Sequence, residues 1–396
     1  MVCVLGRGLC RNDNFPGQAI LSKISVDSCL LIFHAVDEMR TKAASEPYPR
    51  PVHSCATALR GPMKAAVFDR YGPPDVMHVA ELPKPVPTAN QLLIRVRGAE
   101  VTKGDCELRS MDFPVRWFLP LIRLVWGWRK PRRRVLGGYF SGTVAAVGAE
   151  VTRLSVGDDV FGTCGTAMGA HAEFMVVSAD ETVVHKPVGL SFEEAAAVPL
   201  GAMNSLHFLR LGKLRAGERL LINGAGGSIG SFAVQLAKSL DAHVTVVDAP
   251  HKEALLLGLG ADRFVDYTAV DLGSHEARYD MVFDMVAASD FAVMRRLLVP
   301  DGRYLTGNPT LKRMWQCLTL SRFSSQQGYF AFARETRQEL LDLAAMADAG
   351  QLRVVLDRVL PLAQAAAAHA RVGSEARVGL VVLVPVSAAD SVATGH

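Results

Sequence analysis

A glycine-rich turn between an apolar run and an amphipathic segment constrains this chain more than any other feature. The stretch LLINGAGGSIGSFAVQLAK (Leu220–Lys238) reads as a strand, a turn and a helix. The helical part repeats apolar residues at i, i+3, i+4 and i+7, the spacing of one helical face: Ile229, Phe232, Ala233, Leu236, Ala237 and Leu240. Gly224, Gly227 and Gly230 have the spacing of a loop that brings a pyrophosphate to a helix N-terminus. The pattern predicts a dinucleotide-binding turn.

The segments around this turn alternate between strand and helix patterns. Strand-like runs occupy residues 219–225, 243–249, 263–267, 280–286 and 303–308, and residues 251–260 read as a helix. Such β-α succession predicts an α/β fold with a doubly wound parallel sheet. Upstream, residues 63–188 hold short β-branched runs with turn residues every eight to twelve positions, which is typical of an all-β unit.

Two late strand-like runs, at residues 353–362 and 378–385, do not extend the β-α alternation. We expect them to return to the N-terminal β unit. The predicted organisation is therefore a β domain from residues 63–188 and 326–385, a parallel-sheet domain from residues 189–325, and a flexible tail at 386–396. Residues 1–62 lack periodicity and are expected to form a disordered extension or sequence upstream of the true start; a targeting segment is the alternative.

Composition excludes several classes of function. The seven cysteines form no C-x-x-C pair, which indicates a reduced, intracellular chain, and a cytoplasmic location is expected. The net charge of +4 does not argue for nucleic-acid binding. No apolar run approaches the roughly 20 residues that a membrane-spanning helix needs.

The end of the second strand of the parallel sheet bears on the choice of cofactor. Asp248 follows the glycine turn near the offset at which a carboxylate binds ribose hydroxyls, which favours NADH over NADPH. His251 and Lys252 come next, and a cation there could hold a 2′-phosphate instead; alternatively, Lys252 is a solvated residue at a helix start. The sequence therefore does not decide between NADH and NADPH.

These residues, together with MKAAVFDRYGPPDV, GTVAAVGAEVTRLSVGDDVFG and LSFEEAAAVP, resemble the medium-chain dehydrogenase/reductase superfamily. The most similar branch is the zinc-independent quinone oxidoreductases, including the zeta-crystallin-like group. The resemblance covers roughly residues 63–384. It implies a GroES-like β domain, a Rossmann domain and a return to the first domain.

The resemblance also implies a set of cofactor contacts. Ser228 stands where many members carry glycine, and its hydroxyl could still face the phosphates. Lys252 and Tyr267 fit the positions that hold a 2′-phosphate, whereas Asp248 resembles NAD-dependent members. The turn Thr306–Asn308 matches the one near the nicotinamide. The expected cofactor residues are Gly224, Gly227, Ser228, Ile229, Gly230, Asp248, Lys252, Tyr267, Gly307 and Asn308.

Zinc is not expected. The zinc-dependent relatives carry a cysteine where this chain has Thr102, and a His–Glu pair where it has Gly138 and Tyr139. A catalytic zinc needs three nitrogen, sulfur or oxygen ligands in tetrahedral geometry. The residues at these positions do not supply them, so we predict a site without metal.

Catalysis without a metal requires positioning and polarisation of the acceptor. Tyr139 is a candidate proton donor to a carbonyl oxygen; the alternative is a tyrosine packed in the domain core. Thr102 and Asp105 are further candidates, Asp105 with a structural alternative, and His171 reads as a strand residue without chemical role.

The segment WFLPLIRLVWGWRKPRRR (Trp117–Arg134) combines three tryptophans with a basic cluster. In the related reductases this region borders the substrate cleft, so Trp117, Trp126 or Trp128 is expected to line a pocket for a flat apolar substrate. A membrane-surface or nucleic-acid segment is the alternative. The arginines are expected to form a solvated face.

The resulting hypothesis is an NAD(P)H-dependent, zinc-independent oxidoreductase that transfers a hydride to a small quinone, enone or related carbonyl. One alternative is an NAD(P)-dependent alcohol or aldehyde dehydrogenase of the same fold. The other is a binding protein that senses NADPH, or binds RNA or a protein partner, without turnover. Relatives commonly pair through edge strands of the Rossmann sheet, which leaves a homodimer as the assembly to test.

Overall fold

A six-stranded sheet contains the strand that precedes the glycine-rich turn. Its order is β10-β9-β8-β11-β12-β13, and each neighbouring pair is parallel. The strands are β8 (Arg219–Asn223), β9 (His243–Asp248), β10 (Arg263–Asp266), β11 (Tyr279–Asp284), β12 (Leu298–Thr306) and β13 (Gln327–Phe330). The order reverses between β8 and β11, and ligands of open parallel sheets bind at the carboxyl ends of the strands at such a point.

The structure is a computed structural model that describes residues 61–113, 116, 119–307, 309–331, 333–374 and 376–385. These residues all fall within one compact unit, Glu46–His396. The expected N-terminal extension and C-terminal tail, apart from Gly61 and Pro62, lie outside the described residues.

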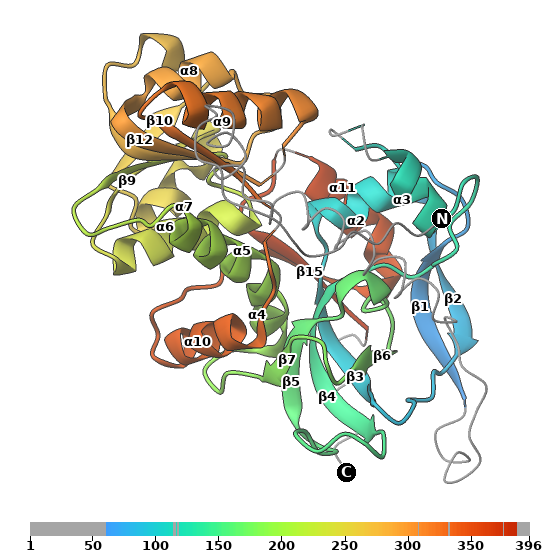
Figure 1. Cartoon of the computed structure of the whole chain (residues 1–396). Coiled ribbons are helices and arrows are strands. Elements are labelled where there is room, and N and C mark those ends of the chain that lie inside the picture. Colours follow the sequence, from blue (N-terminus) through green and yellow to red (C-terminus); the bar gives the residue numbers. More distant parts are fainter. Residues whose placement is uncertain are drawn as a thin grey trace, which may run out of the picture. The chain divides into compact units, whose positions relative to one another are not determined.

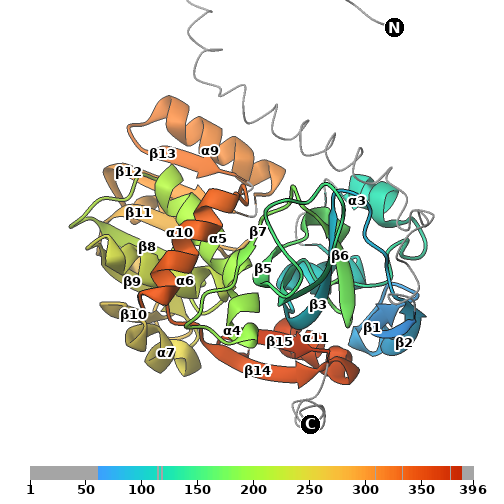
Figure 2. The same ribbon diagram turned by 90° about the horizontal axis from the view of Figure 1, so that it is seen from below.

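Helices accompany the parallel sheet (Figures 1 and 2). They are α5 (Val198–Leu211), α6 (Ser228–Ser239), α7 (Glu253–Gly258), α8 (Phe291–Arg296), α9 (Leu311–Phe323) and α10 (Arg337–Asp348). The apolar face predicted for the segment after the glycine turn is confirmed, because Phe232, Ala233 and Leu236 of α6 are buried. Helices α5 and α6 pack closely because Gly201 lacks a side chain: a Cβ there would lie 2.5 Å from the ring of Phe232.

Short helices connect these elements. The helix α4 (Phe192–Ala196) begins with a capping box, in which Ser191 Oγ accepts from the Glu194 amide at 3.1 Å and Glu194 accepts from the Ser191 amide at 2.9 Å. The 3₁₀ segments are η1 (Pro74–Val76), η2 (Gly165–Ala167), η3 (Pro250–Lys252), η4 (Leu272–Ser274) and η5 (Leu362–Gln364).

The β domain contains a hairpin and a mixed sheet. The hairpin is β1 (Pro62–Phe68) with β2 (Met77–Pro83). The sheet has the order β14-β15-β3-β4-β5-β7, and β6 pairs with β3. Its strands are β3 (Gln91–Glu100), β4 (Tyr139–Val147), β5 (Asp159–Thr163), β6 (Phe174–Ser178), β7 (Val183–His185), β14 (Leu356–Pro361) and β15 (Leu380–Val384).

The chain returns to this domain at its end, as the sequence predicts. Strand β15 pairs antiparallel with β3, and Val382 lies opposite Glu100. Figure 2 shows β14, β15 and the helix α11 (Ala365–Gly373) beside β3, apart from strands β8–β13.

The parallel sheet extends further along the chain than predicted. The proposed boundary at residue 325 precedes β13, which pairs with β12 in the parallel sheet. The helices α8 and α9 were not expected either. The run QGYF of β13 has no apolar alternation, and the strand forms because Gly328 lets it approach α9: a Cβ there would lie 2.7 Å from the Cα of Cys317.

The structure shows where part of the tryptophan segment packs. The helix α3 (Leu119–Trp126) places Trp126 in the core of the β domain, in one buried cluster with Phe113 and Leu136, which favours a packing role for this residue. Trp128 is 62% exposed, and Trp117 lies outside the described residues. An apolar helix face buries its largest side chain wherever a core is within reach.

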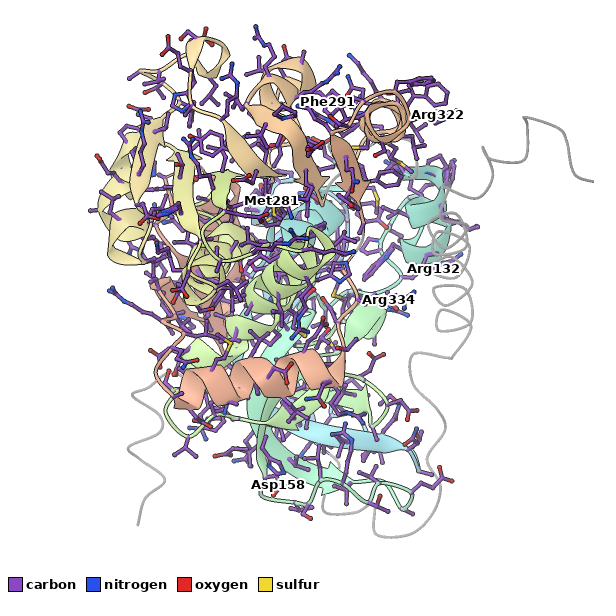
Figure 3. All side chains as sticks on the ribbon, turned by 60° about the vertical axis from the view of Figure 1, so that its left-hand side comes forward. Arg132, Asp158, Met281, Phe291, Arg322 and Arg334 are labelled. Atoms are coloured by element: carbon purple, nitrogen blue, oxygen red, sulfur yellow. The ribbon has the colours of Figure 1, made fainter. Side chains whose placement is uncertain are left out.

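Side chains of both domains are drawn in Figure 3. Met281 lies inside the parallel-sheet domain, whereas Arg322 projects from α9. Among the residues that the structure describes, no helix is long and apolar enough to span a bilayer.

Candidate active site

A cavity of about 650 Å³ opens at the carboxyl ends of the central parallel strands. Most of its lining comes from the parallel-sheet domain: Asn223, Gly224, Gly227, Val247, Asp248, Lys252, Tyr267, Val270, Asp271, Leu272, Val286, Ala288, Ser289, Asp290, Val293 and Met294. The β domain and the returning segment contribute Lys103, Val372, Ser374 and Arg377. The cavity therefore lies where the strand order reverses, and it is bounded by both domains.

Three positions in the turn are occupied by glycine, each for a different physical reason. Gly224 has φ +83°, a conformation that favours glycine. A Cβ on Gly230 would lie 2.5 Å from the Cα of Ala225, so only glycine lets α6 start so close to the preceding loop. Gly227 differs, because a Cβ there would meet no protein atom closer than 3.9 Å. Gly227 faces the cavity, and its missing side chain leaves room for a ligand at the N-terminus of α6.

Asp248 and Lys252 form a buried ion pair at the end of β9. Lys252 Nζ lies 2.9 Å from Asp248 Oδ1, and each side chain is 8% exposed. Asp248 also accepts hydrogen bonds from the amide of Gly226 at 2.6 Å and from that of Ala249 at 2.8 Å. The carboxylate thus holds the glycine turn in place, and both charges of the pair line the cavity.

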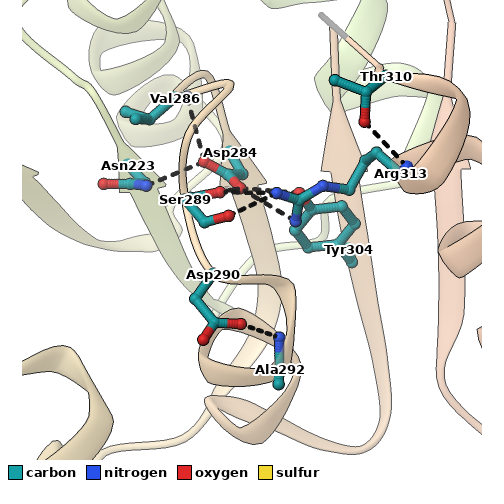
Figure 4. Close-up of polar contacts among 9 residues, drawn as sticks. All are labelled: Asn223, Asp284, Val286, Ser289, Asp290, Ala292, Tyr304, Thr310 and Arg313. Atoms are coloured by element: carbon teal, nitrogen blue, oxygen red, sulfur yellow. Dashed lines mark hydrogen bonds and ion pairs between the residues drawn. The ribbon is translucent and has the colours of Figure 1, made fainter.

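A polar network joins the ends of β8 and β11 at the wall of the cavity (Figure 4). Asp284 at the end of β11 accepts from Asn223 Nδ2 at 2.9 Å, from the Val286 amide at 3.1 Å, from the Tyr304 hydroxyl at 2.7 Å and from the Ser289 hydroxyl. The buried Arg313 of α9 donates to Tyr304 Oη at 2.9 Å and lies 3.9 Å from Asp284 Oδ2.

This network stabilises the turn after β11. Arg313 also donates to the Ser289 carbonyl at 2.6 Å. Val286 and Ser289 both line the cavity. A satisfied buried network of this kind orders the segment that carries it.

The start of α6 fits the pyrophosphate of a nicotinamide dinucleotide. Ser228, the first residue of α6, has a buried hydroxyl without a hydrogen-bond partner among the described residues. Arg377 lines the same cavity, and its Nη2 would lie 3.9 Å from a Cβ placed on Gly227. A helix N-terminus, an unsatisfied hydroxyl and a guanidinium are the groups that bind phosphate oxygens.

Thr102 and Asp105 have a structural role at the start of α2 (Lys103–Ser110). Thr102 Oγ1 accepts from the Asp105 amide at 3.0 Å and donates to Asp105 Oδ2 at 2.6 Å, and the Thr102 amide donates to the same oxygen at 2.8 Å. Asp105 Oδ1 accepts from the Gly137 amide at 3.0 Å. The carboxylate is thereby fully engaged, which favours the structural alternative for Asp105.

Tyr139 begins β4 and is half-buried. Its hydroxyl donates a hydrogen bond of 2.5 Å to Glu335 Oε1. Burial and the Glu335 carboxylate raise the pKa of Tyr139 well above its usual value. Burial also raises the pKa of Glu335, although hydrogen bonds from Tyr139 and Thr163 offset part of that rise. The backbone of Glu335 is held by Thr182 Oγ1, which donates to its carbonyl at 2.6 Å.

A histidine and cysteine cluster lies in the interior of the β domain. Cys106 Sγ is 3.6 Å from His369 Nδ1, and the His369 ring contacts that of His171 edge to face, with centroids 5.7 Å apart. Burial lowers the pKa of both histidines and raises that of Cys106 to about 11. The cluster is therefore neutral at pH 7.

The described residues at positions 102, 138 and 139, where the zinc-dependent relatives carry ligands, do not form a zinc site. Within the described residues, no group of three or more His, Cys, Asp or Glu side chains is arranged to hold a metal ion. Thr102 and Tyr139 have hydroxyl groups already paired with carboxylates. The prediction of a zinc-independent site rests on this donor chemistry and stays a prediction.

The structure brings together some of the expected site residues and separates others. Five line the cavity: Gly224, Gly227, Asp248, Lys252 and Tyr267. Ser228, Ile229 and Gly230 form the first turn of α6 directly behind it. Gly307 follows β12 beside Phe208 and is not among the lining residues, and Asn308 lies outside the described residues. Tyr139, Thr102 and Asp105 are not among the lining residues either.

Three charged residues at or near these groups had no signal in the sequence: Arg377 lines the cavity, Glu335 is bonded to Tyr139, and Glu100 lies near Ser228 and Arg377. Glu335 belongs to the stretch where the β-α pattern loosens, Arg377 precedes the last strand, and Glu100 ends β3. A lone charged residue in an irregular stretch is most often solvated, so only their convergence in space identifies them.

Comparisons with known proteins agree with this architecture. The family model of the alcohol dehydrogenase GroES-like domain matches residues 88–188, and that of the zinc-binding dehydrogenase matches residues 259–383. The quinone oxidoreductase of Pseudomonas aeruginosa is 30% identical over 339 residues, which cover 81% of this chain and 99% of that protein. The human protein named NAD(P)H oxidoreductase RTN4IP1, mitochondrial, is 29% identical over 382 residues, which cover 85% of this chain and 93% of that protein.

A solved structure shows the same fold. The quinone oxidoreductase from Coxiella burnetii matches with a TM-score of 0.72 and 26% sequence identity, over 82% of this chain and 99% of that one. The relatives named quinone oxidoreductase and NAD(P)H oxidoreductase support an oxidoreductase, and the GroES-like domain joined to a Rossmann-type sheet agrees with that class. The chain belongs to the medium-chain dehydrogenase/reductase superfamily and is similar to its quinone oxidoreductases.

Proposed function

We propose that this protein is an NAD(P)H-dependent, zinc-independent reductase of quinones, enones or related conjugated carbonyls. The observation that carries the proposal is the cavity at the start of α6, where Gly227, Lys252 and Arg377 offer a helix N-terminus and two cations to one ligand. Support also comes from the quinone oxidoreductases among the relatives.

Different residues around the cavity would bind different parts of a dinucleotide. Gly227, Ser228 and Arg377 would hold the pyrophosphate, and Lys252 with Tyr267 would hold a 2′-phosphate. When bound, the reduced nicotinamide supplies a hydride. The protein must then orient the acceptor and exclude water from it.

Tyr139 holds the proton that the reduced acceptor needs. The phenol is protonated at neutral pH, but its raised pKa makes it a weak acid by itself, so its proton can leave only if another group supplies a proton to Oη. Loss of that proton next to an ionised Glu335 would place two negative charges 2.5 Å apart. A protonated Glu335 would avoid this pair of charges. The hydrogen bond between the two groups would first reverse, so that Tyr139 Oη gives its proton to the acceptor and receives the carboxyl proton of Glu335.

The pKa of Glu335 is raised, which favours this protonated form. Below that pKa the pair holds two protons, and above it the pair holds one. Turnover through Tyr139 is therefore expected to decrease as the pH rises through the pKa of Glu335.

The test uses the purified full chain with NADH or NADPH and a simple quinone such as 1,4-benzoquinone. Loss of absorbance at 340 nm that depends on the quinone supports the proposal. A change in cofactor fluorescence without turnover with any conjugated carbonyl would instead identify a binding protein. Turnover only with an alcohol and the oxidised cofactor would identify a dehydrogenase of the same fold.

Zinc independence has its own measurement. Metal analysis of the purified protein is expected to find zinc well below one atom per chain, and activity is expected to survive a strong chelator. Stoichiometric zinc that is lost together with activity would contradict the proposal.

Two further expectations belong with this function. We propose a homodimer that pairs through the edge strand β13. A cytoplasmic location also stays a prediction. The name of the human relative places that relative in mitochondria.

A further inference from the structure

The carboxyl group of Glu100 is buried in the protein interior. Glu100 ends β3, where its backbone lies opposite Val382 of β15. The residue is 1% exposed; among the described residues neither carboxyl oxygen has a hydrogen bond of full geometry, and the Ser228 hydroxyl is near enough to interact with it. An ionised carboxylate in such surroundings is costly, so the protein interior favours the neutral acid.

The surroundings of Glu100 include the start of the proposed cofactor helix. The hydroxyl of Ser228, the first residue of α6, and the guanidinium of Arg377 are close enough to lower the pKa of Glu100. The Ser228 hydroxyl is buried, and among the described residues Glu100 is the group it can interact with, without full hydrogen-bond geometry. Arg377 and the N-terminal end of α6 are also the groups that face the cavity. One cation and one helix terminus therefore serve both Glu100 and the cavity.

Three further titratable groups of the described residues lie near Glu100. Asp105 of α2 raises its pKa, Tyr139 of β4 is near enough for Glu100 to raise the pKa of the phenol, and His171 contacts the Glu100 carbonyl through Nε2 at 3.4 Å. Burial dominates and brings the pKa of Glu100 to about 8. The pKa of His171 is lowered and that of Tyr139 is raised, so neither shift brings a second titration toward this value.

We propose that Glu100 couples cofactor binding to protonation: a nicotinamide dinucleotide binds when Glu100 is neutral, and binding to the ionised form takes up one proton there. The inference rests on the proposed function, because it requires a pyrophosphate at α6. Glu100 acts as a positioning residue through Arg377 and the helix terminus, since it is not among the residues that line the cavity.

The direction of the coupling follows from charge. A bound pyrophosphate adds negative charge at the same helix terminus and guanidinium, so it raises the pKa of Glu100 above its value in the free protein. Below pH 8 Glu100 is protonated in both states, and affinity does not depend on this group. Above pH 8 the free protein loses the proton, and affinity decreases by up to about tenfold per pH unit.

The first experiment measures proton uptake by isothermal titration calorimetry. NADH or NADPH, whichever binds more tightly, is titrated into the full chain at pH 7 and pH 8.5 in buffers of different ionisation enthalpy. We expect no uptake at pH 7 and a substantial fraction of one proton at pH 8.5. No uptake at pH 8.5, with an affinity independent of pH between 7 and 9, would overturn the inference.

The second experiment assigns the proton to its residue. Glu100→Gln mimics the neutral acid with the same shape, so it is expected to abolish the uptake and to bind about tenfold more tightly than wild type at pH 9, with equal affinity at pH 7. Glu150→Gln, at an exposed glutamate, is the matched control and should retain the uptake. Uptake that persists in a folded Glu100→Gln variant assigns the proton elsewhere and overturns the inference.

The two proposals fail separately. If neither nucleotide binds at pH 7, where Glu100 is neutral, the proposed function fails. If a nucleotide binds at pH 7 and wild-type protein takes up no proton at pH 8.5, only the role of Glu100 fails. The wild-type measurement does not depend on whether a variant folds.

Discussion

Lys252 Nζ lies 2.9 Å from Asp248 Oδ1 at the end of β9, and both side chains are almost completely buried. The pair combines the two opposing indications of the sequence, an acid that favours NADH and a base that favours NADPH. Each partly neutralises the other. The preference for a nucleotide therefore depends on which charge the 2′-position of the cofactor meets.

We predict that Asp248→Ala increases affinity for NADPH about tenfold relative to NADH. The substitution removes a negative charge from the cavity and frees Lys252 for the 2′-phosphate; an ionic hydrogen bond contributes about 1.5–3 kcal/mol. Fluorescence titration with both reduced nucleotides gives the ratio of dissociation constants. Lys252→Gln is the matched variant and should weaken NADPH binding. An unchanged ratio of dissociation constants in both variants would show that Asp248 and Lys252 do not interact with the 2′-position of the cofactor.

Tyr139→Phe should lower turnover about 100-fold, since general acid catalysis typically contributes that much or more. The dissociation constant of the cofactor should stay near that of wild type, because Tyr139 is not among the residues that line the cavity. Steady-state rates and fluorescence titration separate the two effects. Unchanged turnover would reject Tyr139 as the proton donor.

Glu335→Gln tests the partner of Tyr139. Wild-type turnover should decrease as the pH rises through the raised pKa of Glu335, because the ionised form cannot return a proton. The glutamine variant should be slower and should lose this pH dependence. The readout is the pH profile of turnover, which a purely structural role would not change. A variant that retains the wild-type profile would remove Glu335 from the proton path.

Gly227→Ala and Gly230→Ala form a matched pair within one turn. A Cβ at position 227 meets no protein atom closer than 3.9 Å, so the variant should unfold at the wild-type temperature but bind cofactor at least about tenfold more weakly. A Cβ at position 230 meets the Ala225 backbone at 2.5 Å, so that variant should lose about 1–3 kcal/mol of free energy of unfolding. Thermal unfolding without cofactor and titration with it measure both. Equal stability loss in the two variants would contradict this assignment.

Arg313→Met should lower the free energy of unfolding by about 3 kcal/mol, because it leaves the buried Asp284 carboxylate without its cation. Tyr304→Phe should cost about 1 kcal/mol, since Asp284 keeps its other donors. Urea denaturation measures both. A cost for Arg313→Met no larger than that for Tyr304→Phe would show that the charge pairing is not what stabilises the turn after β11.

The homodimer is testable at α9, which leaves apolar side chains exposed beside the edge strand β13. Trp315 is 69% exposed and Phe323 is 80% exposed. If two copies pair at this edge, the double substitution Trp315→Glu, Phe323→Ser should shift the sedimentation coefficient to that of a monomer. Leu257→Ser, at an exposed apolar residue of α7, is the control and should leave it unchanged. A wild-type protein that sediments as a monomer at micromolar concentration contradicts the dimer.

Local patterns alone sufficed for the fold class and for the glycine turn between β8 and α6. The 3.6-residue apolar period of α6, the glycine spacing before it and the Ser191–Glu194 capping box are properties of neighbouring residues, so they are readable in one dimension. The return of β14 and β15 to the first domain also followed, because two strands remained that the alternation could not place.

The chemistry of the cleft was decided by residues far apart in the chain. Tyr139 meets Glu335 across 196 positions, and Glu100 meets Ser228 and Arg377 only because β3, α6 and the returning segment converge. The same packing turned Asp105 from a candidate catalyst into a helix cap and placed Trp126 in the core. Periodicity reports which face of a segment is buried, whereas the partner of a buried polar group is set by whichever distant segment packs against that face.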